Sequence, residues 1–282
     1  MANTPIPYFD FLLAQLATHN PAVEKSFGRH VHWGYWPEPA EARCDDEDYA
    51  EAAERLTLEL CAMAEVRAGD RVLDAGCGFG GTLASLNERL GGMDLAGLNI
   101  DGRQLERARR QVIPLGDNRV SFCQGDACRL PFADGSFDRL LAVECIFHFP
   151  SREQFFAEAC RVLRPGGTLA LSDFVPAPLL LPSVAVLERS RRFARFNYFG
   201  QCNLRYTLGR YRRLAAAAGL VPLAQRNVTA NILPTYRYLR ALVARKASAK
   251  GYAGKAGYLI DLLRYLGTLR LLNYCLLSYR KP

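Results

Sequence analysis

One short segment constrains the fold of this chain more than any other: a strand that leads directly into a glycine-rich turn. Residues 71–75 form a short run typical of a buried strand, and Gly76, Gly78 and Gly80 follow at once. Glycines allow the backbone to approach a ligand closely, and the N-terminus of the next helix presents free N–H groups. The segment therefore predicts a ligand-binding site where a strand meets a helix.

The chain continues from this turn with alternating helix and strand patterns. Helices are expected at 81–90, 103–112, 151–163 and 207–218. Strands are expected at 94–100, 119–123, 139–143, 168–173 and 269–279. Helices of about ten to fifteen residues between strands indicate a parallel sheet covered on both faces. We therefore predict an α/β fold with a doubly wound, mostly parallel sheet.

The length of 282 residues fits a single large domain, within which three parts differ in pattern. Residues 1–55 predict a helical N-terminal segment, and residues 56–173 form the core of alternating strands and helices. Residues 174–282 contain an irregular, aromatic and arginine-rich insertion at 174–204, followed by helices and closing strands. We expect this last part to bind the substrate.

The charge of the chain is distributed unevenly. Residues 1–173 hold 17 Lys or Arg and 26 Asp or Glu, whereas residues 174–282 hold 19 Lys or Arg and only two acids. The C-terminal part predicts contact with an anion, either a phosphate or carboxylate on a substrate or an acidic membrane surface. A solvated basic surface is the simpler alternative. Nucleic acid is not expected, since no binding motif accompanies the charge.

Cysteine usage and hydropathy predict a cytoplasmic protein. The nine cysteines form no C-x-x-C pair, which argues against a disulfide scaffold and a zinc finger. No basic and apolar leader begins the chain, and prolines interrupt the most apolar tract, residues 174–187. His30 and His32 have no third ligand nearby in the sequence, so no metal site is predicted.

Asp74, two residues before Gly76, narrows the choice of ligand. A carboxylate at this position is awkward beside a pyrophosphate but suits a cationic ammonium group. The D-x-G-x-G run resembles the first motif of the class I S-adenosylmethionine-dependent methyltransferases, whose glycines face the methionine part of that cofactor. A nicotinamide-dependent oxidoreductase, and a protein that keeps the cofactor pocket without transferring a methyl group, are the alternatives.

The resemblance extends in order through residue 173 and implies further cofactor contacts. Asn99 stands where the family usually places an acid on the ribose hydroxyls, with Gln104 as a second ribose partner and Asp101 as the competing candidate. Asp126 resembles the residue that accepts a hydrogen bond from the adenine amino group. The other residues that the resemblance places against the cofactor are Ile100, Ala127 and Val143.

Two segments resemble the small-molecule branch of the family, which acts on sterols, tocopherols and polyketides. The turn at residues 32–36 resembles its H-x-G-Y-W motif, which implies that Tyr35 covers the sulfonium. Residues 144–148 resemble its E-x-x-x-H pattern. His148 is then a candidate base for a hydroxyl acceptor, and Glu144 a candidate to orient the acceptor or to remove a proton after attack on an alkene.

The resemblance as a whole implies S-adenosylmethionine-dependent methyl transfer to an oxygen or carbon of a small, largely apolar acceptor. Natural products, isoprenoids and polyketides are the expected acceptor types. We expect the aromatic turn, Phe147, residues 174–204 and residues 235–266 to line the acceptor pocket. Arg191 and Arg195, four residues apart, would share a helical face and could grip a phosphate or carboxylate.

Overall fold

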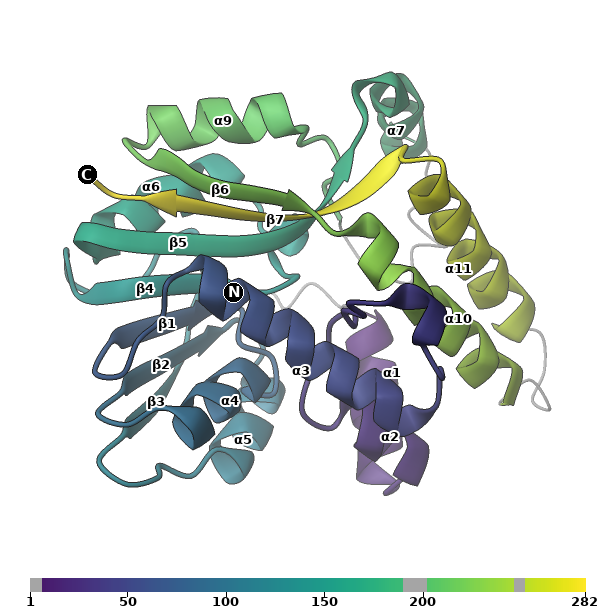
Figure 1. Ribbon diagram of the computed structural model, residues 1–282, viewed down its shortest axis with the longest axis horizontal. Coiled ribbons are helices and arrows are strands. Elements are labelled where there is room, and N and C mark those ends of the chain that lie inside the picture. Colours follow the sequence, from purple (N-terminus) through teal and green to yellow (C-terminus); the bar gives the residue numbers. More distant parts are fainter. Residues whose placement is uncertain (1–6, 190–201, 246–251) are drawn as a thin grey trace.

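A computed structural model describes residues 7–189, 202–245 and 252–282, and its centre is a seven-stranded sheet (Figure 1). The strand order is β3-β2-β1-β4-β5-β7-β6. The strands are β1 (Arg71–Ala75), β2 (Asp94–Asn99), β3 (Arg119–Gln124), β4 (Phe137–Ala142), β5 (Leu163–Pro176), β6 (Val221–Asn227) and β7 (Leu272–Arg280). β1 to β5 run parallel, whereas β7 is antiparallel to both β5 and β6. The predicted doubly wound, mostly parallel α/β fold is confirmed.

Helices cover both faces of the sheet. The helices are α1 (Pro7–Ala17), α2 (Pro21–Phe27), α3 (Asp46–Met63), α4 (Gly81–Arg89), α5 (Gly102–Gln111), α6 (Arg152–Val162), α7 (Leu181–Arg189), α9 (Leu208–Ala217), α10 (Thr229–Arg245) and α11 (Tyr252–Thr268). Short 3-10 turns are η1 (Pro39–Glu41), η2 (Ile146–His148) and η3 (Pro178–Leu180). No helix in these described ranges is long and apolar enough to cross a membrane.

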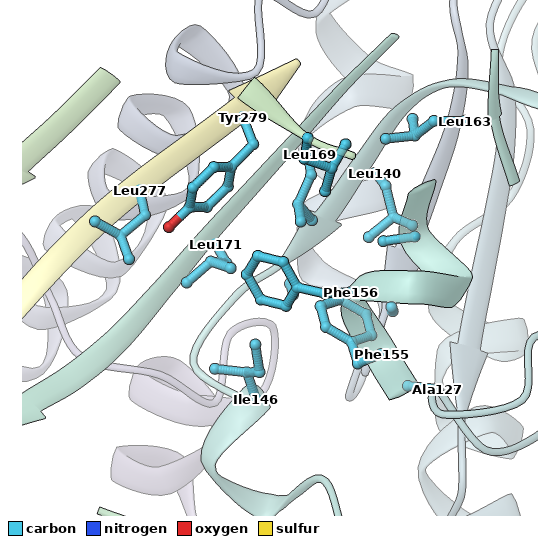
Figure 2. Packing of buried hydrophobic residues seen from close by; sticks show 14 of the residues in the cluster. Ala127, Leu140, Ile146, Phe155, Phe156, Leu163, Leu169, Leu171, Leu277 and Tyr279 are labelled. Carbon is cyan, nitrogen blue, oxygen red and sulfur yellow. The ribbon is translucent and has the colours of Figure 1, made fainter. Parts of the chain in front are cut away.

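Alternate residues of the central strands contribute to two different hydrophobic cores, as expected for strands buried on both faces. Leu140 and Leu169 pack in one core with Phe155 and Phe156 of α6, as Figure 2 shows. The adjacent Leu141 packs on the opposite face, in a core that includes residues of α3, α4, α10 and α11. The two cores together fix the sheet, and with it the carboxyl ends of β1, β2 and β4.

The N-terminal helices form a third, smaller core beside the glycine turn. Leu12 and Leu16 of α1 and Phe27 of α2 pack in one cluster with Tyr49 of α3 and with Phe79 from the turn after β1. Side chains of α10 complete this cluster, so α1 and α2 lie against the ends of α3 and α10 (Figure 1). The N-terminal segment thus contains helices α1 and α2, and it is packed against the end of the core that carries the glycine turn.

The region after residue 173 is more regular than its sequence pattern indicates. β5 continues to Pro176, because residues 168–176 pair in register with β7, and α7 follows within the segment expected to be irregular. β6 was not predicted; all seven of its residues are exposed, so no burial pattern marks it in the sequence. Arg191 and Arg195 lie outside the described residues, so the structure does not test their expected role.

Candidate active site

A cavity of about 610 Å³ opens at the carboxyl ends of β1, β2 and β4. The chain leaves β1 and β4 in opposite directions across the sheet, and such a switch point is where open α/β sheets bind ligands. Eleven of the twelve predicted site residues line this cavity. They are Asp74, Gly76, Gly78, Asn99, Ile100, Gln104, Asp126, Ala127, Val143, Glu144 and His148.

The turn after β1 needs glycine for two separate reasons. Gly76 has a φ of +91° and Gly78 a φ of +53°, in the left-handed region that other residues rarely adopt. A Cβ atom on Gly76 would also lie 2.7 Å from the Cys145 sulfur, which is a clash. The sequence thus brings the backbone of this turn close to the loop that follows β4.

The carboxylate of Asp74 is buried at the base of the cavity and is not fully satisfied. Thr82 hydrogen-bonds this carboxylate, but its Oδ1 has no hydrogen-bond partner among the residues described. Burial raises the pKa of Asp74 to about 7. A buried acceptor atom without a donor is costly, so this atom is suited to a cationic ligand group.

Asn99 and Gln104 form a pair at the end of β2. The Asn99 amide donates to Gln104 Oε1 at 3.0 Å, and Asn99 Oδ1 accepts from the Asp101 N–H at 3.2 Å. The carboxylate of Asp101 is engaged elsewhere: it caps α5 and accepts from Arg103 Nη2 at 2.7 Å. Asn99 and Gln104 are thus better candidates than Asp101 to bind the hydroxyls of a ribose, because the Asp101 carboxylate is already engaged.

The loop after β3 contributes Asp126 and Ala127 to the cavity wall. Asp126 Oδ1 accepts from the Cys128 N–H at 2.8 Å, which fixes the direction of the carboxylate. Ala127 and Val143 are buried, whereas Ile100 is 44% exposed at the rim. These residues provide a mainly apolar wall with one oriented acceptor.

Glu144 is held from three sides in a strained backbone conformation. Its φ is +49°, which is rare for a residue with a side chain, and Ser172 Oγ accepts from its N–H at 2.8 Å. Its Oε2 accepts from the Trp33 N–H at 3.0 Å and from the Tyr274 hydroxyl at 2.6 Å. Burial raises the pKa of Glu144 to about 8.

His148 lies in η2, between the cavity and the segment after residue 201. Its ring stacks on Tyr8 with centroids 6.2 Å apart, and Phe147 lies 4.4 Å away on a tilted plane. Its Nδ1 is 3.9 Å from the Cys202 sulfur. The N-capping hydroxyl of Ser151 begins α6 three residues later and anchors this loop.

The position of Tyr35 corrects one prediction. Tyr35 does not line the cavity; its hydroxyl accepts from Arg226 at 3.3 Å, and its ring packs with the core under α3. The aromatic turn instead docks on α10, where Thr235 Oγ1 accepts from the Gly34 N–H at 3.1 Å. Trp33 of this turn therefore braces Glu144, and of residues 32–36 only His32 lines the cavity.

The cavity wall opposite the sheet also differs from expectation. It comes from Tyr8, Phe9 and Asp10 of α1 and from residues 29–32, whereas Phe147 and the described residues within 235–266 do not line it. Phe147 instead packs on Phe174, with ring centroids 5.9 Å apart. Nothing in the local pattern of α1 distinguishes its aromatic residues from ordinary core residues.

His30 and His32, at the edge of the same wall, are engaged within the protein. His30 Nε2 lies 2.8 Å from Glu54 Oε2, and His32 Nε2 lies 3.0 Å from the Thr57 hydroxyl. Burial lowers the pKa of His32 to about 3, so this ring stays neutral. Both imidazoles thus serve to fix the segment that faces the glycine turn.

Comparison with known proteins identifies the family. Residues 73–171 match the methyltransferase domain family. The chain is 34% identical over 269 residues to 27-O-demethylrifamycin SV methyltransferase of Amycolatopsis mediterranei, an alignment that covers 92% of this chain and 93% of that protein. The chain belongs to the S-adenosylmethionine-dependent methyltransferases. The nicotinamide alternative is thereby set aside.

Two further similarities agree with this family assignment. The methyltransferase is 45% identical over 157 residues to methyltransferase GfsG of Streptomyces halstedii, and this alignment covers only 55% of either protein. Its fold matches the crystal structure of geranyl diphosphate C-methyltransferase from Streptomyces coelicolor with a TM-score of 0.69. That match has 18% identity and covers 99% of this chain and all of the other.

S-adenosylmethionine is the cofactor of the methyltransferase, and the cavity fits it. We propose that the unsatisfied Asp74 oxygen accepts from the cofactor ammonium group, because no described protein donor does so. We assign the ribose hydroxyls to Asn99 and Gln104, and the adenine amino group to Asp126. The glycine turn leaves room for the methionine part between these sites.

The buried carboxylate of Asp74 should make the stability of the cofactor-free methyltransferase depend on pH. Its pKa of about 7 lies above the value near 3.9 of an unfolded Asp, so ionisation opposes folding as the pH rises from about 4 to 7. We expect Asp74→Asn to be more stable than the unsubstituted protein at pH 8, by on the order of 3 kcal/mol, with the difference vanishing near pH 4. Urea unfolding at both pH values measures this.

Asp101→Asn is the matched control for this prediction. Arg103 holds the pKa of Asp101 below its usual value despite partial burial, so ionisation of Asp101 favours folding. The Asp101 variant should therefore lose stability at pH 8 and lose less of it at low pH. A stability difference for Asp74→Asn that is the same at pH 4 and pH 8 would contradict the assignment.

Proposed function

We propose that this methyltransferase methylates a hydroxyl oxygen of a small, largely apolar natural product of the polyketide type. The observation that carries the proposal is the place of His148 on the cavity wall, in the loop after β4. An imidazole titrates near neutral pH and can take the proton from an attacking hydroxyl. The cofactor supplies an electrophilic methyl group when bound.

The surroundings of Glu144 argue against carbon methylation. Attack by an alkene would create a cation that a nearby carboxylate must stabilise or deprotonate. Because burial raises the pKa of Glu144 to about 8, this side chain is mostly protonated at neutral pH and is a poor partner for a cation. Its fixed contacts with Trp33 and Tyr274 suit a residue that holds the loop in position.

The wall formed by α1 supplies the apolar surface and excludes water. Tyr8 stacks on His148, and Phe9 packs edge-on against Phe79 with ring centroids 6.4 Å apart. Asp10 pairs with Arg103 Nη1 at 2.9 Å, which ties α1 to α5 beside the proposed ribose site. Methyl transfer by displacement depends chiefly on alignment and on a dry site, and this wall contributes to both.

The relative from Amycolatopsis supports the same acceptor class. Its name specifies methylation of an oxygen in a rifamycin, and it aligns over nearly the whole of both chains. The geranyl diphosphate enzyme shares only its fold with this chain. At 18% sequence identity, its substrate is no guide to the acceptor of this methyltransferase.

An acceptor panel with methyl-labelled S-adenosylmethionine tests the proposal. The panel contains hydroxylated polyketides and phenols, each with a matched analogue whose hydroxyl is already blocked, and prenyl diphosphates, which carry no free alcohol hydroxyl. We expect label transfer to a hydroxylated polyketide and none to its blocked analogue. Transfer that is equal for both members of a pair, or transfer to the prenyl diphosphate alone, would contradict hydroxyl methylation.

Glu144→Gln provides a separate prediction about the same chemistry. Because Glu144 is mostly protonated at neutral pH, the amide should replace it with turnover reduced less than about tenfold. A carbon-methylating enzyme that uses Glu144 as its base should instead lose about 10²–10⁴-fold. Steady-state turnover at pH 7 distinguishes the two, with Tyr274→Phe as a control for the loss of one hydrogen bond to Glu144.

A further inference from the structure

The outer face of α11 carries an exposed apolar stripe that no described element covers. Tyr258, Leu262 and Tyr265 follow one another at intervals of four and three residues, which places them on one helical face, and Leu269 comes directly after the last helical residue, Thr268. Their exposed fractions are 71%, 38%, 61% and 48%. The opposite face is packed, since Ile260 is only 8% exposed.

The stripe continues onto the neighbouring η3 turn. The Ala177 N–H donates to the Leu271 carbonyl at 2.8 Å, so the start of η3 lies beside the end of the stripe. Leu179 of η3 is 81% exposed, and Val186 of α7 is 70% exposed. The exposed Leu179 thus extends the apolar surface beside the end of the stripe.

The charge around the stripe is almost entirely positive. The described residues 229–245 and 252–271 contain six Lys or Arg and one acid, Asp261. Asp261 is neutralised by Arg240, whose Nε lies 3.1 Å from its carboxylate. Arg270, directly after the stripe, is exposed and forms no ion pair with any residue that the structure describes. Arg264 is exposed too, but it lies on the side of α11 that faces α10 and η1.

We propose that this face of α11 and η3 binds an anionic lipid surface. Tyrosine and leucine side chains with nearby arginines are the combination that partitions into the boundary between lipid headgroups and acyl chains. The cations would be attracted to acidic headgroups. A second copy of this chain is a poorer occupant, because two such faces would bring like charges together.

The surface lies on elements that also reach the active site. Only three residues separate the end of α11 from the start of β7, and the Tyr274 hydroxyl of β7 donates to Glu144. α10 packs along α11, and its Tyr236 contacts Trp33 edge-on with ring centroids 5.9 Å apart. In combination with the proposed function, lipid binding here would place the enzyme where an apolar acceptor accumulates.

Vesicle sedimentation with the full chain tests the proposal. The vesicles contain phosphatidylcholine with phosphatidylglycerol, or phosphatidylcholine alone. We expect binding to the anionic vesicles that weakens with salt, and at least about tenfold weaker binding for Tyr265→Ser with Leu269→Ser. Arg270→Gln should reduce the affinity about fivefold.

Ile113→Ser with Leu115→Ser is the matched control, because these residues are 61% and 49% exposed in the loop after α5. This variant should bind vesicles as the unsubstituted protein does. Equal binding by the stripe variant and the control variant, or no binding of the unsubstituted protein to anionic vesicles, would overturn the proposal. So would a dimer in solution that only the stripe variant dissociates.

Methyl transfer to a water-soluble acceptor separates this proposal from the proposed function. The stripe variant should retain this activity, since none of its changed residues lines the cavity. Loss of vesicle binding with normal activity supports the lipid surface. Normal vesicle binding with no methyl transfer to any hydroxyl would contradict the proposed function alone.

Discussion

His148→Ala should reduce turnover on the hydroxyl acceptor by about 10²–10⁴-fold, the usual contribution of a general base. The alanine removes the imidazole from the loop after β4 and leaves the glycine turn and Asp74 in place. We therefore expect unchanged affinity for S-adenosylhomocysteine. Single-turnover methyl transfer measures the first quantity, and calorimetry measures the second.

His19→Ala is the control for this substitution, because His19 is an exposed histidine in the turn between α1 and α2. Its turnover should equal that of the unsubstituted enzyme. If His148→Ala methylates the same hydroxyl at a rate within about threefold of the unsubstituted enzyme, His148 only packs against Tyr8. A loss of cofactor affinity in the same variant would also argue against a role limited to proton removal.

Asp74→Asn should weaken the binding of S-adenosylhomocysteine by about 10- to 150-fold, the range expected when a hydrogen bond to a charged group is lost. The amide keeps the size of the side chain and removes the charge that faces the cofactor ammonium group. The same substitution is expected to stabilise the cofactor-free protein at pH 8. These opposite effects are expected of a buried charge that destabilises the cofactor-free protein and strengthens the binding of the cofactor.

Asp101→Asn is the control for the effect of Asp74→Asn on cofactor affinity, and calorimetry measures both. Asp101 lines the same cavity, but its carboxylate is already paired with Arg103. Its amide variant should bind S-adenosylhomocysteine within about threefold of the unsubstituted enzyme. Equal losses in the two variants would mean that the overall negative charge of the cavity, and not Asp74, recognises the cofactor.

The core of the fold could be predicted from the sequence because each of its parts leaves a local signal. β1 and β4 are short apolar runs bounded by turn residues, and Ser151 marks the start of α6. The glycine turn places Asp74 and Gly76 at the end of β1 irrespective of the rest of the chain. Parallel strands end at the same edge of the sheet, so the cofactor residues converge there.

The other wall of the cavity could not be predicted, because long-range contacts decide its position. Tyr8 reaches the cavity only because α1 packs against α3, α10 and the glycine turn in the N-terminal core. Tyr35 is two residues from Trp33, and hydrogen bonds of this turn with α3 and α10, rather than local pattern, decide where each side chain points. The left-handed backbone of Glu144 likewise depends on partners as distant as Ser172 and Tyr274.

The atom that receives the methyl group is the most direct test of this account. Carbon-13 from labelled S-adenosylmethionine, located by NMR in the isolated product, identifies that atom without reference to any variant. Oxygen methylation with His148 as the base predicts a methoxy carbon, and His148→Ala should form the same product more slowly. A labelled methyl group bonded to carbon would contradict the account and would return Glu144 to consideration as the catalytic base.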